Sequence, residues 1–244
     1  MPRLLLLSDI HGNLSALKAV EKDAFARYPI DGIVLLGDII NYGMRPNETI
    51  EEIRKWDLPL YVNLFGNHEK AIMDGDTSRF STERGRRLLE YTKNKLDQNA
   101  LAFIQERMSR SGMAETEFSG KKFLFVHGSL HDPYWGKMEQ EIAQNADYAR
   151  YDFVLCGHSH VPHLTEHFYS VQNPDYRNKK RVVFINPGSV GQPRNHNPRA
   201  QYAYFDTDTE AIHFNSAAYD IESERSLYPS DLDEFYSERL VRGI

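Results

Sequence analysis

Short runs of apolar residues that end abruptly in polar or glycine-containing turns recur along the chain. The runs lie at Leu4–Leu7, Ile33–Leu36, Leu60–Phe65, Phe123–Val126, Phe153–Cys156 and Val182–Ile185. Within each run the apolar residues are continuous rather than alternating, as in strands that are buried on both faces of a parallel or mixed sheet covered by helices. The pattern therefore predicts an α/β protein.

The spacing of apolar residues between the first strands predicts two crossover helices. Asn13 is expected to cap the first helix, and the second is expected to begin at Asn47. The apolar stripes expected to face the sheet are Leu14, Leu17 and Val20 in the first helix, and Ile50, Ile53 and Trp56 in the second.

The remaining segments complete a single-domain organisation. Residues 71–113 are rich in charged residues, with apolar positions at amphipathic helical spacing, and are expected to form a cap-like helical insertion. Gln201–Phe205 and Ala211–Phe214 flank a turn and predict a hairpin. A C-terminal helix is expected over 230–241, with Ser230 as its N-cap. Because no linker, repeat or low-complexity tract interrupts the chain, residues 1–244 are predicted to form one domain.

Composition narrows the range of functions. The chain has 244 residues and a formal net charge of -6, which argues against a basic surface for non-specific nucleic-acid binding. Its single cysteine, Cys156, excludes an internal disulfide and suits a reducing compartment, so a cytoplasmic location is expected. The apolar run at Leu4–Leu7 is too short for a signal segment or a membrane span.

Residues able to hold a metal ion follow five of the predicted strands. They are Asp9 and His11, Asp38, Asn67 and His68, His127, and His158 and His160. In a twisted α/β sheet the loops after parallel strands meet along one edge, where ligands tend to bind. The two residues of each D-x-H or H-x-H pair point to the same side of an extended segment, so both can reach one site. We therefore expect these side chains to converge.

The types of donor group restrict the metal. The set combines carboxylates, an amide oxygen and imidazoles but contains no thiolate. Such donors suit manganese, iron, nickel, zinc or magnesium better than a soft metal, and argue against a structural zinc knot. Manganese is the favoured ion, although donor chemistry alone leaves the others open.

These motifs resemble, in order and spacing, those of the calcineurin-like metallophosphoesterase family: D-x-H, G-D, G-N-H-D/E, H and G-H-x-H. The resemblance implies a four-layer αββα sandwich of two mixed β-sheets flanked by helices. It also implies two divalent metal ions, with Asp38 bridging them, and attack on phosphate by a metal-bridging hydroxide. One metal would be held by Asp9, His11 and His160, and the other by Asn67, His127 and His158. His68 would face the substrate as an acid or a stabiliser of the transition state.

A narrower resemblance involves Gly37–Gly43, His127–Ser129 and Asn186–Arg194. These segments look like the small bacterial branch that includes predicted phosphodiesterases and asymmetric diadenosine tetraphosphate hydrolases. The resemblance implies a small phosphorylated substrate, with nucleotides such as dinucleoside polyphosphates favoured. Arg194 is a candidate for binding a distal phosphate, and Tyr42 for contacting the substrate.

Two other functions stay open, as do several plainer roles for individual residues. The same fold could act as a serine/threonine protein phosphatase, or as a non-catalytic binding module, and an oligomer is not excluded. Cys156 is expected to be a core residue, and His163 and His167 are expected to face solvent. Glu69 either favours the start of the next helix or supports the site.

Overall fold

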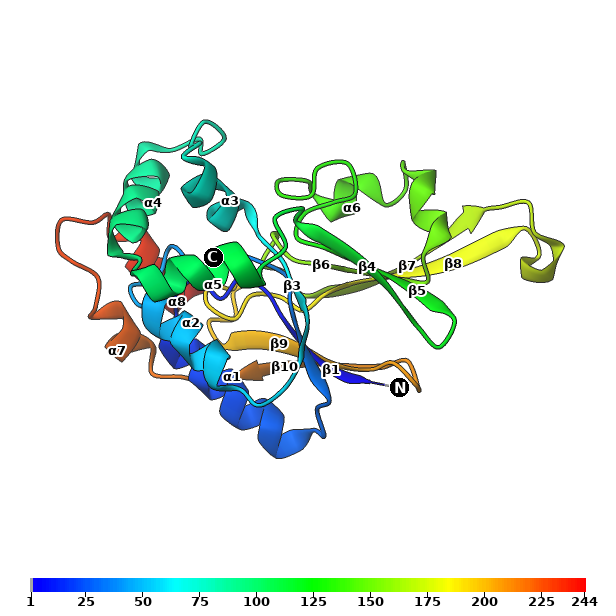
Figure 1. Ribbon diagram of the computed structural model, residues 1–244, viewed down its shortest axis with the longest axis horizontal. Helices are drawn as coiled ribbons and strands as arrows, with labels where there is room; N and C mark the ends of the chain where they lie inside the picture. Colours follow the sequence, from blue (N-terminus) through cyan, green and yellow to red (C-terminus); the bar gives the residue numbers. More distant parts are fainter. Residues whose placement is uncertain (1) are drawn as a thin grey trace.

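The computed structural model describes residues 2–244, which form two β-sheets with helices on their outer sides (Figure 1). The first sheet has the order β10-β9-β1-β2-β3, and the second has the order β4-β5-β6-β8-β7. Both sheets are mixed. In the first sheet β1, β2 and β3 are parallel and β9 and β10 pair antiparallel on the other side, whereas in the second the parallel strands β5, β6 and β8 lie between antiparallel edge strands. The α/β sandwich expected from the sequence is therefore confirmed.

The strands have the following bounds. The first sheet contains β1 (Arg3–Leu7), β2 (Gly32–Leu35), β3 (Leu60–Asn63), β9 (Ala200–Asp206) and β10 (Ala211–Ala217). The second contains β4 (Met113–Phe118), β5 (Lys121–Val126), β6 (Phe153–Cys156), β7 (His163–Ser170) and β8 (Lys179–Asn186).

Alternate residues of the buried strands enter different cores. Leu4 and Leu6 of β1 face the second sheet, where they join Phe123 and Phe125 of β5 in the layer between the sheets. The intervening residues of the same strands face the helices outside. Successive side chains in a strand point to opposite faces, so a continuous apolar run fills two cores at once.

Helices cover the outer face of each sheet. On the first sheet lie α1 (Leu14–Arg27), α2 (Pro46–Lys55) and α5 (Gln98–Arg107), and on the second lie α6 (Met138–Glu141) and the 3-10 helix η1 (Ala146–Arg150). The remaining helices are α3 (Asn67–Asp74), α4 (Glu83–Lys95), η2 (Pro174–Tyr176), α7 (Ile221–Arg225) and α8 (Phe235–Arg242). The carboxamide oxygen of Asn13 accepts the N–H of Ala16 at 3.0 Å, which confirms Asn13 as the N-cap of α1.

Some boundaries differ from the sequence-based expectation. The C-terminal helix begins at Phe235 rather than after Ser230, because the Asp233 carboxylate accepts the N–H of Phe235 in a turn. The second crossover helix begins at Pro46, one residue before Asn47, since the fixed φ of proline suits the first helical position.

The insertion and two edge strands show further differences. The helices of the insertion span α3 to α5, so they begin before residue 71 and end at Arg107. Strands β4 and β7 lacked an apolar run because they are edge strands with largely exposed side chains. Among the described residues, no helix is both long and apolar enough to cross a bilayer.

Candidate metal centre

The side chains predicted to bind metal meet at the edge where both sheets end. They follow β1, β2 and β3 of the first sheet and β5 and β6 of the second, each at the carboxyl end of a parallel strand. The donor atoms of Asp9, His11, Asp38 and His160 all lie within 4.8 Å of one another, as do those of Asp38, His127 and His158. Each group therefore takes donors from both sheets, and Asp38 belongs to both groups.

In the first group, nitrogen and oxygen atoms that carry lone pairs face one another with no proton between them. His11 Nδ1 lies 3.1 Å from the carbonyl oxygen of Ile40, and His160 Nδ1 lies 2.6 Å from that of Gln192. Each Nδ1 must carry the ring proton that it donates, so each neutral ring presents a bare Nε2. The two Nε2 atoms are 3.2 Å apart, and His160 Nε2 is 3.1 Å from Asp9 Oδ1. A bound cation would relieve the repulsion among these atoms.

The second group places histidine nitrogens against the oxygens of Asp38 and Asn67. His127 Nδ1 donates to the carbonyl oxygen of Leu36 at 2.7 Å, and its Nε2 lies 3.1 Å from Asn67 Oδ1 and 3.3 Å from Asp38 Oδ2. His158 Nδ1 is 3.0 Å from the same Asn67 oxygen. Burial opposes protonation of His127, but Asp38 more than offsets this and raises its pKa to about 9. The surroundings therefore favour a positive charge at this point.

The two carboxylates fit a cation site. Asp9 Oδ1 and Asp38 Oδ2 are buried and have no hydrogen-bond partner among the described residues. Burial alone would raise the pKa of both carboxyls, but the neighbouring histidines, His160 for Asp9 and His127 for Asp38, hold both pKa values below their usual range. A buried, ionised and unpaired carboxylate oxygen is costly unless it binds a cation. The donor set therefore fits divalent metal ions.

The backbone that carries these side chains is strained. Asp9, His11, Asp38, His158 and His160 have positive φ values between 51° and 64°, in the left-handed region. This conformation costs about 1–2 kcal/mol for each non-glycine residue. It persists only where the surrounding structure fixes it, and such strain is concentrated at functional sites.

Glu69 holds the loop that carries Asp38. Its fully buried carboxylate accepts backbone N–H groups from Gly66 at 2.8 Å, Asp38 at 2.9 Å and Ile40 at 3.1 Å. Burial and Asp38 raise the pKa of Glu69 to about 7, whereas these donors favour the ionised form. The contacts support both roles left open by the sequence, because the bond from Gly66 caps the start of α3 and the other two position the loop of the site.

His68 lies beside the cluster and takes its orientation from the helical insertion. Its Nδ1 is 2.6 Å from Nδ2 of Asn41, whose Oδ1 accepts the hydroxyl of Thr92 in α4 at 2.9 Å. Because an amide nitrogen only donates, Nδ1 is the acceptor and the proton of the neutral ring sits on Nε2. Burial lowers the pKa of His68 to about 4. His68 thus presents an N–H group 3.7 Å from Asp38 Oδ2.

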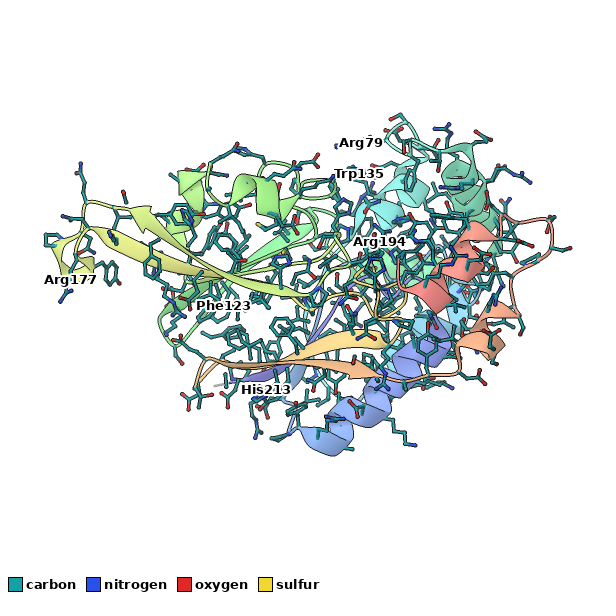
Figure 2. All side chains as sticks on the ribbon, turned by 180° about the vertical axis from the view of Figure 1, so that it is seen from behind. Arg79, Phe123, Trp135, Arg177, Arg194 and His213 are labelled. Atoms are coloured by element: carbon teal, nitrogen blue, oxygen red, sulfur yellow. The ribbon has the colours of Figure 1, made fainter. Side chains whose placement is uncertain are left out.

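Aromatic rings form the walls around the cluster. The ring of Tyr42 lies 4.6 Å from the rings of both His11 and His68, measured between centroids. Phe80, from the insertion, lies 5.1 Å from His68 and 5.0 Å from Trp135. Figure 2 shows Trp135 beside Arg79 near the insertion, away from β10 at the opposite side of the molecule.

Sequence reasoning missed residues that orient the histidines of the site. Asn41 and Thr92 orient His68, and the carbonyl oxygen of Gln192 orients His160. Asn41 sits within the segment from Gly37 to Gly43 that the sequence had already singled out, so its polar side chain was an available signal. The backbone carbonyl of Gln192 offers no comparable signal, and neither does Thr92, which lies 51 residues after Asn41 in the sequence.

Comparison with known proteins gives consistent matches. The profile of the calcineurin-like phosphoesterase superfamily domain matches residues 3–210. An uncharacterised protein of Methanocaldococcus jannaschii is 31% identical over 246 residues, covering 98% of each chain. Phosphodiesterase YfcE of Escherichia coli is 26% identical over 212 residues, covering 87% of this chain and 91% of YfcE. The crystal structure of a metallophosphoesterase from Sphaerobacter thermophilus has a TM-score of 0.77 and 27% identity, covering 100% of this chain and 99% of that one.

Proposed function

This chain belongs to the calcineurin-like phosphoesterase superfamily and is a metal-dependent phosphoesterase, and we propose that it hydrolyses phosphate esters or phosphoanhydrides of nucleotides at two divalent cations. The observation that carries the two-cation proposal is the pair of buried donor groups that share Asp38. In the first group lone pairs face one another, and in each group a buried carboxylate oxygen has no hydrogen-bond partner among the described residues.

The proposed ligands divide between the two groups. Asp9, His11 and His160 would hold one cation, Asn67, His127 and His158 the other, and Asp38 both. When bound, a pair of divalent cations supplies Lewis-acid activation of water and neutralises charge on the phosphoryl oxygens. Asp9 and Asp38 offset only two of the four positive charges, which leaves a site that attracts anions. Manganese is favoured because oxygen and imidazole donors without thiolate suit such ions.

We assign His68 to the reacting phosphate. Its Nδ1 is taken by Asn41, so the Nε2–H group is free to donate to an equatorial or leaving oxygen. With the ring neutral, stabilisation of the transition state by this hydrogen bond is favoured over proton delivery from an imidazolium. Asn41 and Thr92 would keep the ring in the productive orientation.

The surroundings of the site support a nucleotide as substrate. Trp135 is half-buried, with its ring 5.9 Å from that of His158, and offers a face on which a base could stack. Tyr42 would contact the substrate from the side of His11 and His68. Arg194 would bind phosphate, since its backbone N–H donates to the carbonyl oxygen of His160 at 3.2 Å and thereby fixes the residue beside the cluster.

The test is hydrolysis by manganese-reconstituted protein of bis-p-nitrophenyl phosphate, p-nitrophenyl phosphate and diadenosine tetraphosphate. We expect turnover of at least the diester and the dinucleotide. Absence of turnover of all three compounds, by protein that has bound two metal ions per chain, would refute the proposal.

A variant pair tests the role of His68. His68→Ala should retain two metal ions per chain, measured by elemental analysis, while kcat falls roughly 10²–10³-fold. The control is His213→Ala, which removes an exposed histidine on β10 and should leave kcat unchanged. Full activity of the His68 variant would exclude the assigned role.

A further inference from the structure

Two arginines at the rim of the metal centre have no Asp or Glu partner in the part of the chain that the structure describes. Arg194 is half-buried in the loop after β8, and its buried Nε has no hydrogen-bond partner among the described residues. Arg239 belongs to α8, is only 9% exposed, and donates from Nε to the carbonyl oxygen of Ile244. Neither guanidinium forms an ion pair with an Asp or Glu side chain of residues 2–244, although the chain carries 35 such residues.

The two arginines come from segments that pack together. The loop that follows Arg194 meets the end of α8, where the N–H of His196 donates to the carbonyl oxygen of Gly243 at 2.7 Å. Figure 2 shows Arg194 next to α8, in agreement with this contact. Burial and the positive charge of Arg194 lower the pKa of Arg239 to about 10. Two positively charged side chains thus come from segments in contact, and an anion bound between them would offset their charge.

Both arginines adjoin the metal cluster. Arg239 Cζ is 6.0 Å from the ring centroid of Tyr42, and the rings of His11 and His68 lie 4.6 Å from the same centroid. The backbone N–H of Arg194 donates to the carbonyl oxygen of His160 at 3.2 Å, so the loop that carries Arg194 borders the cluster as well. A group bound between them would therefore adjoin a phosphoryl group held at the cluster.

We propose that Arg194 and Arg239 form a second anion subsite that binds a further phosphate group of the substrate. The proposal rests on the function proposed above and narrows its substrate class to compounds with at least two phosphate groups, such as nucleoside or dinucleoside polyphosphates. Guanidinium groups suit this task because their planar donors match phosphate oxygens in pairs. Arg239 would act as a substrate-binding residue supplied by the C-terminal helix.

A purely structural role for Arg239 predicts a different outcome. Its guanidinium also lies 5.1 Å from the ring of Phe235, so it could serve only to pack α8. Loss of a packing arginine would weaken all ligands equally. Loss of a subsite would weaken only those ligands that carry the second phosphate.

The experiment measures that selectivity with manganese-loaded full-length protein. Isothermal titration calorimetry compares adenosine 5′-monophosphate with the α,β-methylene analogue of adenosine diphosphate, which differs by one anionic group. We expect the wild type to bind the analogue at least tenfold more tightly, and this ratio to fall below about twofold in Arg194→Gln and in Arg239→Gln. Arg239→Lys should recover part of the ratio, because it keeps the charge.

The control and the contrary outcomes are defined by the same ratio. The control is Arg242→Gln. Arg242 is an exposed residue of α8 that pairs with Glu238 at 3.2 Å, and its replacement should preserve the wild-type ratio. If Arg239→Gln fails to fold, Arg194→Gln alone decides. An unchanged ratio in a folded Arg194→Gln or Arg239→Gln variant, or no preference in the wild type, overturns the subsite. Selective binding by a protein inert towards every phosphate ester would instead overturn the proposed hydrolysis and leave the subsite standing.

Discussion

Replacing Glu69 with glutamine tests how far the site depends on a single buried carboxylate. The carboxylate accepts three backbone N–H groups, from Gly66 and Asp38 on Oε2 and from Ile40 on Oε1. An amide keeps one oxygen and turns an NH₂ group towards the remaining donors. If the amide oxygen takes the place of Oε2, only the N–H of Ile40 loses its acceptor. If the amide oxygen takes the place of Oε1, the N–H groups of Gly66 and Asp38 both lose theirs.

The magnitude follows from that count. A hydrogen bond to a charged group contributes about 1.5–3 kcal/mol, and a buried donor left without a partner loses at least this much. In the orientation that breaks only one bond, that loss alone would lower the free energy of unfolding by about 2–3 kcal/mol. Removal of the buried charge, whose cost raises the pKa of Glu69 to about 7, offsets part of this loss. Because the released N–H belongs to the loop carrying Asp38, metal affinity should fall roughly 10–100-fold.

The assay is urea unfolding of the chelated protein, followed by calorimetric titration with manganese. The unfolding midpoint should shift while the slope with urea stays constant, as expected when stability alone changes. Glu90→Gln, in an exposed position of α4, is the control and should have no effect. If Glu69→Gln matched the wild type within about 0.5 kcal/mol and bound manganese equally well, the positioning role of Glu69 would be wrong.

Three further results are expected. Asn41→Ala should retain both metal ions but lower kcat by at least tenfold, because His68 loses the donor that fixes its tautomer. Steady-state kinetics and metal analysis check this, and an unchanged kcat at full metal content would contradict it. Saturating manganese at about 100 times its Kd should stabilise the chelated protein by about 2.7 kcal/mol for each of the two sites, or roughly 5–10 °C in Tm per site, and calorimetry showing no shift would contradict metal binding to the folded state. Gly66→Ala should abolish manganese binding, since a Cβ there would lie 2.0 Å from Asp38 Oδ1; undiminished binding in a titration would show that the loop can move aside.

The sequence predicted the interior of this fold better than its borders. The continuous apolar run Leu4–Leu7 predicted a strand, because a strand buried on both faces carries apolar residues at every position. The other central strands were predicted for the same reason. Strands β4 and β7 lie at sheet edges, where solvent permits polar side chains and the pattern disappears. The start of α8 was misplaced because Ser230 fits the N-cap pattern, while the structure uses Asp233 for a turn instead.

The candidate site could be anticipated only where a residue type reveals its role. Histidine and aspartate after buried strands are conspicuous, and the structure brings all of them together. Arg239 gave no such signal, because an arginine in a charged C-terminal segment normally faces solvent and only the packing of α8 buries it. The orienting carbonyl oxygens of Ile40, Leu36 and Gln192 are equally invisible in a sequence, since every residue has one.

The division of donors between the two sheets also has a mechanical consequence. A cation held by Asp9 and His160, or by Asn67 and His127, would link the two sheets at the edge where both end, as a covalent cross-link would. Stripping the metal would then loosen this end first, while the apolar layer around Phe123 and Phe125 keeps the rest of the sandwich closed. Chelation should accordingly speed the exchange of amide hydrogens in the loops after β1 and β6, relative to metal-loaded protein, more than it speeds exchange within the strands themselves.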